Sequence, residues 1–129
     1  MKLGLHEALI DLSEQFAKSN VILDFVFKLD NEIYKDPQQK LMLYRIIQEL
    51  TKNAVNHGKA NYISVHCDKQ KNSMVIHFED NGSGFKNAEE SDGTGIANIK
   101  NRVVFLKGKI SFTSSDQGSI CNIILPLND

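Results

Sequence analysis

The sequence predicts an α/β protein of the α+β type: a two-layer sandwich in which three helices cover one face of a mixed, mostly antiparallel five-stranded sheet. Segments with apolar residues at three- and four-residue spacing alternate with segments in which every second residue is apolar, giving the order αβαββαββ. Two of the connections between strands are short and polar, as in hairpins. Because helices on one side leave the other side uncovered, we expect one face of the sheet to be solvated.

The first two predicted elements are a helix and a strand. Residues 4–19 carry apolar side chains at helical spacing, namely Leu5, Ala8, Leu9, Leu12 and Phe16. Residues 21–29 are rich in β-branched and aromatic side chains, which predicts a strand. The polar residues 30–36 connect this strand to the next helix.

A long helix is predicted over residues 38–57. Asp36 and Pro37 match a helix start, with a capping carboxylate followed by proline at the first helical position. One apolar stripe runs along this helix and consists of Leu43, Ile46, Ile47, Leu50 and Ala54. We expect Gly58 to form the C-terminal cap that ends the helix.

Two hairpins and a third helix complete the predicted fold. The hairpin strands are predicted near 63–67, 74–78, 109–114 and 119–125, with polar turns at 71–73 and 116–118. Pro126 stops the last strand. Between the hairpins, residues 85–92 are polar without periodicity and predict a loop. The helix that follows is predicted from Ile96, Ile99, Val103 and Leu106.

The composition of the chain excludes several classes of function. A net charge of -1 gives no broad basic field for nucleic acid. Cys67 and Cys121 lack the CxxC spacing of a zinc or redox site, so we expect both to be buried and reduced. No apolar run approaches the roughly 18 residues of a membrane span, and no leader opens the chain. We therefore expect a monomeric cytoplasmic piece without membrane contact, and leave open whether a parent protein is membrane-anchored.

Three polar residues recur at four-residue intervals on the long helix. Glu49, Asn53 and His57 follow the rim of the apolar stripe. Carboxylate and amide oxygens at a partly desolvated rim bind a cation more strongly than in open water, which suits Mg²⁺. The alternative is that Glu49 and Asn53 are ordinary solvated residues, although asparagine is a poor former of helix interiors. His57 is equally explained as a favourable partner of the helix dipole.

An aspartate ends the strand predicted near 74–78, in the run Asp80-Asn81-Gly82-Ser83-Gly84-Phe85. Alternation places Asp80 on the core-facing side of that strand, where its carboxylate needs a donor. The exocyclic amine of adenine is such a donor, and the two glycines let a ligand approach the backbone. A turn-capping aspartate followed by ordinary turn residues is the alternative.

A third motif, Gly93-Thr94-Gly95, precedes the helix predicted from Ile96. Backbone N–H groups at a helix N-terminus, together with the helix dipole, favour phosphate. Short Gly-x-Gly matches are common by chance, so this one indicates a phosphate site only beside the other two motifs. No GxxxxGK[ST] stretch occurs in the chain, which disfavours a P-loop.

These motifs together resemble those of the ATP-binding catalytic domain of bacterial sensor histidine kinases, in the Bergerat-type superfamily shared by gyrase, Hsp90 and MutL. Residues 44–57 resemble the N box, 80–85 the G1 box and 93–99 the G2 box. Residues 101–103 and 124–127 resemble the short-lid subfamily of the NarX/DesK type. The resemblance covers nearly the whole chain, so residues 1–129 are expected to form one ATP-binding domain of a larger sensor kinase.

The resemblance implies ATP and Mg²⁺ as ligands and assigns roles to individual residues. Asn53 would ligate Mg²⁺, Glu49 would act as a catalytic residue that positions the metal's water or the reacting group, and Asp80 would read adenine. The other nucleotide-binding positions that it implies are Asn56, His57, Gly82, Gly84, Gly93, Thr94, Gly95 and Ser119. Of these, Ser119 stands where the family often has a threonine that supports the aspartate.

Two positions depart from the family pattern. Asn56 stands where many relatives have lysine or arginine, so one charge that neutralises phosphate is missing. Lys107 replaces the first glycine of a Leu-Gly-Gly turn, which concerns the fold rather than the chemistry. His6 and Glu7 mimic an acceptor pair but fall in the first predicted helix, so we do not expect His6 to accept phosphate.

The implied activity is phosphoryl transfer from ATP to a histidine on a separate dimerisation hairpin, which in turn serves a response regulator. We expect that histidine to lie outside this chain, so that the chain alone does not phosphorylate itself. Two alternatives stay open. One is another ATPase of the superfamily, such as an anti-sigma-factor serine kinase with Glu49 as general base, and the other is a degenerate domain that only docks partners.

Overall fold

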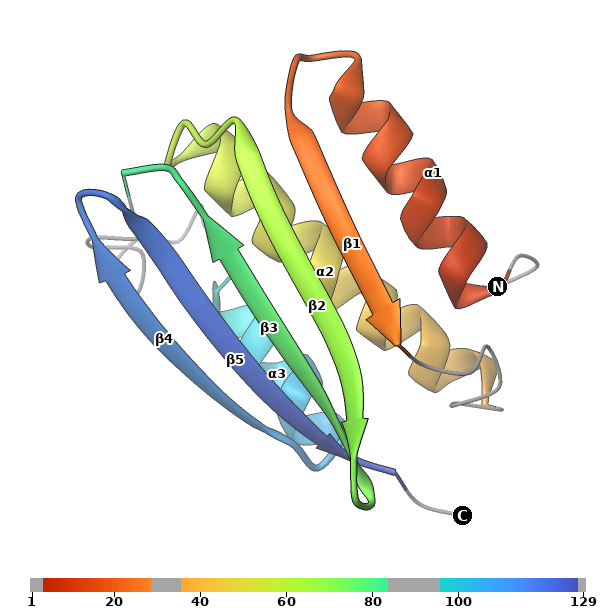
Figure 1. Ribbon diagram of the computed structural model, residues 1–129. Coiled ribbons are helices and arrows are strands. Elements are labelled where there is room, and N and C mark those ends of the chain that lie inside the picture. The colour runs from red at the N-terminus through yellow and green to blue at the C-terminus, as the bar shows by residue number, and fades with distance from the viewer. Residues whose placement is uncertain (1–3, 29–35, 84–95, 128–129) are drawn as a thin grey trace.

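The computed structural model describes residues 4–28, 36–83 and 96–127. These residues form three helices and a five-stranded sheet (Figure 1). The elements are α1 (Leu5–Ala17), β1 (Ile22–Lys28), α2 (Pro37–Asn56), β2 (Tyr62–Gln70), β3 (Ser73–Asp80), α3 (Ile96–Phe105), β4 (Lys109–Ser115) and β5 (Gly118–Pro126). The strand order is β1-β2-β3-β5-β4, with β1 and β2 parallel and the other pairs antiparallel. The predicted order of elements and the mixed sheet are confirmed.

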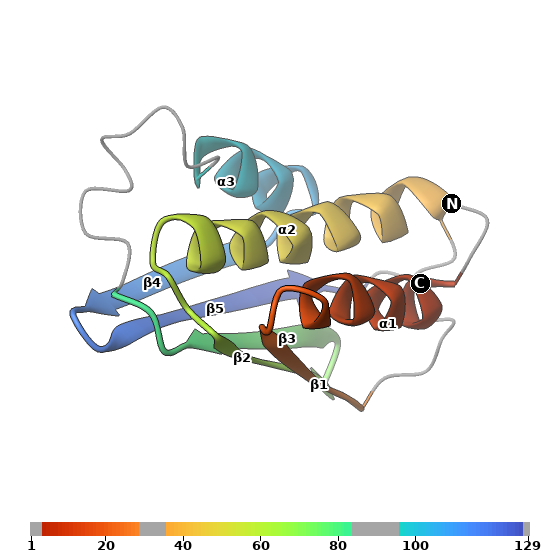
Figure 2. The same ribbon diagram turned by 90° about the horizontal axis from the view of Figure 1, so that it is seen from above.

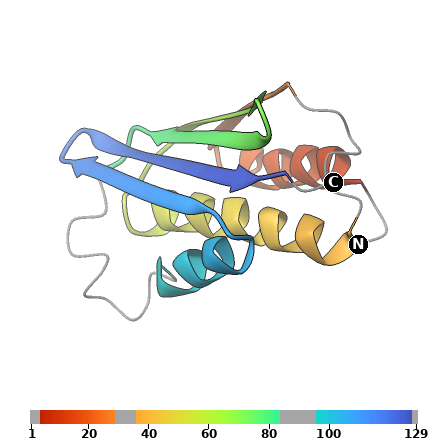
Figure 3. The ribbon, with the colours of Figure 1, turned by 90° about the horizontal axis from the view of Figure 1, so that it is seen from below.

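The three helices lie on one face of the sheet, as Figures 2 and 3 show. The largest fully buried side chains come from the helix stripes and from alternate strand positions: Leu9, Leu12, Leu43, Ile46, Ile47, Leu50, Ile63, Met74, Ile76, Phe78, Ile99 and Ile123. The alternate positions on strands β2 and β5 include the exposed residues Tyr62 and Ile124. The predicted two-layer sandwich with one solvated face is therefore confirmed.

Helix α2 begins as predicted but ends differently. The Asp36 carboxylate accepts a hydrogen bond from the Gln38 N–H (2.9 Å), and Pro37 is the first helical residue. The prediction of a glycine cap is wrong in one respect, because the residue with left-handed backbone is Lys59 (φ 58°), not Gly58. Conformational freedom therefore does not explain the glycine at position 58. Lys107, which follows α3, also has positive φ (61°).

Both predicted hairpins are present, and each has a turn of two residues. Residues 71–72 join β2 to β3, so that Ser73, expected in the turn, is the first residue of β3. Residues 116–117 join β4 to β5, so that Gly118 begins β5. Figure 1 shows the two turns at opposite ends of the sheet. The turn at 116–117 lies at the end where β3 finishes.

The two cysteines are buried and free, as the sequence predicts. Burial raises the pKa of the Cys67 thiol and of the Cys121 thiol from 9.0 to about 12. Among the residues that the structure describes, no helix is long and apolar enough to cross a membrane. The predicted loop at 85–92 lies outside the described residues.

Candidate functional site

Strand β3 ends with an aspartate on the face that the helices cover. Asp80 is only 6% exposed. Its Oδ1 accepts a hydrogen bond from the Gly82 N–H (2.8 Å), and its Oδ2 accepts one from the Ser119 hydroxyl. A carboxylate has about four lone-pair sites, so both oxygens can accept from a further donor. The carboxylate is therefore fixed in place and still able to bind an amine.

Strand β5 brings Gly118 and Ser119 against the end of β3. Ser119 pairs with Asp80 across the antiparallel ladder and is 2% exposed. Gly118 has φ 139°, and a Cβ at this position would lie 2.1 Å from the Asp80 carbonyl oxygen. Only glycine allows this backbone conformation and this approach. The sequence indicates a turn at Gly118 but carries no local signal for its contact with Asp80.

Helix α2 contributes a buried amide. Asn53 is 3% exposed, and its Nδ2 has no hydrogen-bond partner. The buried hydroxyl of Thr51, in contrast, donates to the Ile47 carbonyl oxygen (2.8 Å). An unpaired buried polar group costs about 1–3 kcal/mol. A ligand that pairs with Asn53 would remove this cost, and because a half-turn of the amide exchanges its oxygen and nitrogen, the residue also fits a metal ion.

The other candidates on α2 lie around Asn53. Glu49 is one turn earlier and partly buried, whereas Asn56 and His57 are exposed at the end of the helix. Within residues 4–28, 36–83 and 96–127, no three or more His, Cys, Asp or Glu side chains form a group that could hold a metal ion. The predicted residues outside the described part of the chain are Gly84, Gly93, Thr94 and Gly95.

The ends of α2 and β3 meet where residues 58–62 contact residues 81–83, and we call this contact the α2–β3 junction. The Ser83 N–H donates to the Gly58 carbonyl oxygen (2.7 Å). A Cβ on Gly82 would lie 2.5 Å from that same oxygen, so the two segments touch through bare backbone. Close approach across the junction thus explains the glycine at position 82. The glycine at position 58 is explained by its own helix, because a Cβ there would lie 2.9 Å from the Ala54 carbonyl oxygen, which the sequence analysis did not predict.

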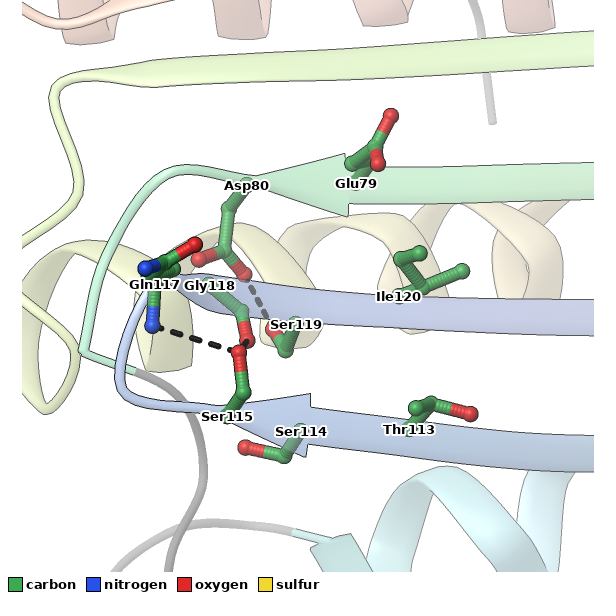
Figure 4. Close-up of a pocket in the computed structure, with 9 residues that line it drawn as sticks. All are labelled: Glu79, Asp80, Thr113, Ser114, Ser115, Gln117, Gly118, Ser119 and Ile120. Atoms are coloured by element: carbon green, nitrogen blue, oxygen red, sulfur yellow. Dashed lines mark hydrogen bonds between the residues drawn. The ribbon is translucent and has the colours of Figure 1, made fainter.

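A hollow of about 160 Å³ lies at the Asp80 end of the sheet (Figure 4). It is lined by Glu79, Asp80, Thr113, Ser114, Ser115, Gln117, Gly118, Ser119 and Ile120. Most of these residues carry hydroxyl, amide or carboxylate groups. The lining comes from β3, β4, β5 and the turn at 116–117, and includes neither Asn53 nor Glu49. That Asp80 and Asn53 face one shared nucleotide pocket therefore stays a prediction.

Comparison with known proteins identifies a family. Residues 38–129 match the family described as histidine kinase-, DNA gyrase B-, and HSP90-like ATPase. The chain is 36% identical over 120 residues to the sensor histidine kinase ComP of Bacillus subtilis (strain 168), covering 88% of this chain and 15% of that protein. It is 32% identical over 90 residues to the signal transduction histidine-protein kinase/phosphatase DegS of Brevibacillus brevis, covering 68% of this chain and 23% of that protein. The chain thus spans less than a quarter of either relative.

Solved histidine kinases share the fold. A histidine kinase domain from the blue-light activated histidine kinase of Erythrobacter litoralis EL346 matches 95% of this chain and 59% of its own, with a TM-score of 0.75 at 15% identity. The Acinetobacter baumannii histidine kinase AdeS matches 97% of this chain and 64% of its own, with a TM-score of 0.72 at 16% identity. With the family match and the curated relatives, the chain belongs to the histidine kinase-, DNA gyrase B- and HSP90-like ATPases, and within them to the sensor histidine kinases of the ComP and DegS type.

Proposed function

We propose that this domain binds ATP together with Mg²⁺ and presents the γ-phosphate to a histidine on a separate dimerisation hairpin. Membership of the family implies ATP binding and ATP-dependent phosphorylation in two-component signalling. The observation that carries the finer proposal is the combination of a fixed, buried carboxylate at Asp80 with an unpaired, buried amide at Asn53. Two donors fix the Asp80 carboxylate, the Asn53 side chain is buried, and both groups have unused hydrogen-bonding capacity.

Asp80 is suited to recognise adenine. The donors from Ser119 and Gly82 fix the carboxylate, and its free lone pairs can accept from the exocyclic amine of the base. Guanine carries a carbonyl oxygen at the same ring position, and two acceptors facing each other without a proton repel. We therefore propose that Asp80 selects ATP over GTP.

The phosphates would lie on the α2 side of the site. Asn53 would hold Mg²⁺ through its amide oxygen, and Glu49 would position a water or the reacting group. Mg²⁺ commonly takes one or two protein ligands beside phosphate oxygens and water, and when bound it neutralises charge on those oxygens. His57 would contact phosphate or ribose beside Asn56. The residues proposed to shape the base pocket and the phosphate cradle are Gly82, Gly84, Gly93, Thr94 and Gly95.

In the proposed reaction, the lone pair of an imidazole nitrogen on the hairpin attacks the γ-phosphorus in line, while the bond to the β,γ-bridging oxygen breaks and ADP leaves. The domain contributes by holding ATP in the geometry for attack, which can lower the barrier by about 7–11 kcal/mol. His6 of this chain belongs to α1 and stacks on Phe27, with ring centroids 5.4 Å apart. We propose that the isolated chain cannot phosphorylate itself.

The partners in this proposal belong to a larger kinase. The chain covers 15% and 23% of the curated relatives named above, so the hairpin, the response regulator that it serves and any membrane anchor are proposals about a parent protein. The domain itself would be monomeric and cytoplasmic.

The test is transfer of label from ATP carrying ³²P at the γ-position. With Mg²⁺ and the hairpin of the parent kinase, we expect acid-labile label on the hairpin and none on the isolated chain. Asn53→Ala should abolish transfer. Asn122→Ala, which removes an exposed amide that contacts His77 (2.7 Å) on β3, is the matched control and should transfer normally.

Stable label on the isolated chain would contradict the proposal. Acid-stable label on an added serine-containing antagonist, with none on the hairpin, would favour the serine kinase alternative. If the chain bound no nucleotide at all, it would be a docking domain.

A further inference from the structure

Asn81 directly follows Asp80 and is tied to the start of β2. Its Oδ1 accepts hydrogen bonds from the N–H groups of Asn61 and Tyr62 (both 3.0 Å), and its Nδ2 donates to Asn61 Oδ1 (2.7 Å). Its own N–H donates to the Tyr62 carbonyl oxygen (3.2 Å). An asparagine in an ordinary turn bonds to nearby backbone. The side chain of Asn81 instead bonds to residues 61 and 62, which are distant from it in the sequence.

The three residues at 80–82 are each anchored to a different element. Asp80 bonds to Ser119 of β5, Asn81 bonds to the start of β2, and Gly82 packs against Gly58 at the end of α2. An anchor on every residue leaves this segment little freedom to rotate. The orientation of the Asp80 carboxylate is therefore set from three directions.

The hydrogen bonds of Asn81 also link it, through residues 60 and 61, to helix α2. Asn61, which pairs with Asn81 through its side chain, follows Ala60, and the Ala60 N–H donates to the Ala54 carbonyl oxygen (2.9 Å). Ala54 is the neighbour of Asn53. Two sets of hydrogen bonds, joined by the backbone between residues 60 and 61, thus connect the segment that carries Asp80 with the helical turn that carries Asn53.

We propose that Asn81 is a positioning residue for nucleotide selection: its amide holds Asp80 at the distance and angle from Asn53 at which one purine nucleotide engages both. This inference rests on the proposed function. Asn81 itself touches no nucleotide and acts through Asp80. A displacement of about 1 Å is enough to weaken recognition by a preorganised site, so loosening Asn81 should reduce the preference for ATP as well as the affinity.

The experiment is calorimetric titration with non-hydrolysable analogues of ATP and GTP in the presence of Mg²⁺. Asn81→Ala removes the side-chain acceptor of two backbone N–H groups, and we expect at least tenfold weaker binding of the ATP analogue and at least a fivefold lower ATP-to-GTP preference. Asn81→Asp keeps an acceptor for both N–H groups but loses the donor to Asn61, so its preference should lie between those of wild type and Asn81→Ala. Asn122→Ala removes an exposed amide from the surface of β5, and this variant should bind both analogues as the wild type does.

The ratio of the dissociation constants for the ATP and GTP analogues distinguishes a positioning role of Asn81 from a purely structural one. Unfolded molecules lower the number of binding sites per chain but leave the ratio of dissociation constants for the folded molecules unchanged. If Asn81→Ala does not fold, two milder variants test whether Asn81 positions Asp80. These are Asn81→Asp and Asn61→Ala, and the latter removes only the acceptor of the Asn81 Nδ2 bond. Full ATP preference in these variants would overturn this inference alone, whereas a wild-type chain that binds neither analogue would overturn the proposed function.

Discussion

The two β-hairpins have turns of equal length but different surroundings. Between β2 and β3, the turn residues Lys71 and Asn72 are exposed, and Lys71 has φ 56°. Between β4 and β5, the turn leads into Gly118, which has φ 139° and approaches the Asp80 carbonyl oxygen, and into Ser119, which bonds the Asp80 carboxylate. The first turn accepts a hydrogen bond from the Leu127 N–H at the Asn72 carbonyl oxygen (2.7 Å), far from Asp80, whereas the second turn shapes the candidate site.

The comparison shows that an unusual backbone conformation does not by itself mark a functional site. Lys71 has a left-handed backbone, a conformation that residues other than glycine adopt at a cost, and it is an exposed turn residue. The positive φ of Gly118 coincides with a close approach to the backbone carbonyl oxygen of Asp80, a buried residue whose carboxylate is hydrogen-bonded. That coincidence is the reason for placing Gly118 in the candidate site.

Substitution of Gly118 should have the largest effect. Gly118→Ala places a Cβ at 2.1 Å from the Asp80 carbonyl oxygen and forces a side chain into φ 139°. We expect the free energy of unfolding to fall by about 3 kcal/mol and affinity for an ATP analogue to fall more than tenfold. Urea denaturation and calorimetry measure the two effects. Wild-type stability together with wild-type affinity would break the distinction between the hairpins.

Removal of the Ser119 hydroxyl should have the next largest effect. Ser119→Ala takes away the donor to Asp80 Oδ2 and leaves a buried carboxylate oxygen unpaired. We expect a loss of about 1–3 kcal/mol in stability and about tenfold weaker binding of the ATP analogue. Ser119→Thr keeps a hydroxyl and should largely restore affinity. Equal binding by the alanine variant and the wild type would show that Ser119 does not support Asp80.

The two buried cysteines, one in each hairpin, test whether burial on the core side affects the stability of the two hairpins equally. Cys67 lies in β2 and Cys121 in β5, and burial raises the pKa of each thiol from 9.0 to about 12. Because the folded pKa is raised, the stability that each thiol contributes is complete below pH 9.0 and is lost as the pH rises toward 12. Above pH 9.0, each thiol should lower the free energy of unfolding by about 1.4 kcal/mol per pH unit.

Urea denaturation at pH 8 and pH 10 measures this dependence. Cys67→Ala and Cys121→Ala should each reduce the loss of stability between these pH values, and by similar amounts. A reduction in only one variant would show that the hairpins differ inside the core as well as at their turns.

The smallest effect is expected at the exposed turn. Lys71→Gly relieves the positive φ at this position and should stabilise the fold by about 0.5–1 kcal/mol. Affinity for an ATP analogue should stay within twofold of wild type, because the turn lies at the far end of the sheet from Asp80. Thermal unfolding and calorimetry provide the measurements, and a larger change in affinity would contradict the independence of this turn from the candidate site.

Much of the fold and part of the site follow from local pattern in the sequence. The period of two places Asp80 and Ser119 on the covered face of their strands, where the structure joins them by a hydrogen bond. The helical stripe places Asn53 beside the core, although at 3% exposure it is buried more deeply than a rim position. Such patterns are readable because burial repeats with the geometry of the helix or strand.

The α2–β3 junction could not be predicted because it depends on residues distant in sequence. The residues around Asn81 have the pattern of an ordinary turn, and its hydrogen bonds to residues 61 and 62 form only because the start of β2 lies beside it. Likewise, no local pattern indicates that Gly82 packs against the Gly58 carbonyl oxygen. The sequence also suggested glycine for the left-handed position after α2, yet Lys59 occupies it. Tertiary contacts, not local preference, decide these positions.

The Mg²⁺ dependence of ATP-analogue binding in the wild type and in Asn53→Ala tests the central claim most directly. If Asp80 and Asn53 serve one nucleotide site, calorimetry should show one site per wild-type chain, with affinity at least tenfold higher in Mg²⁺ than in a chelator. Asn53→Ala should still bind the analogue but lose most of this difference. Equal Mg²⁺ dependence in the two proteins would contradict the account.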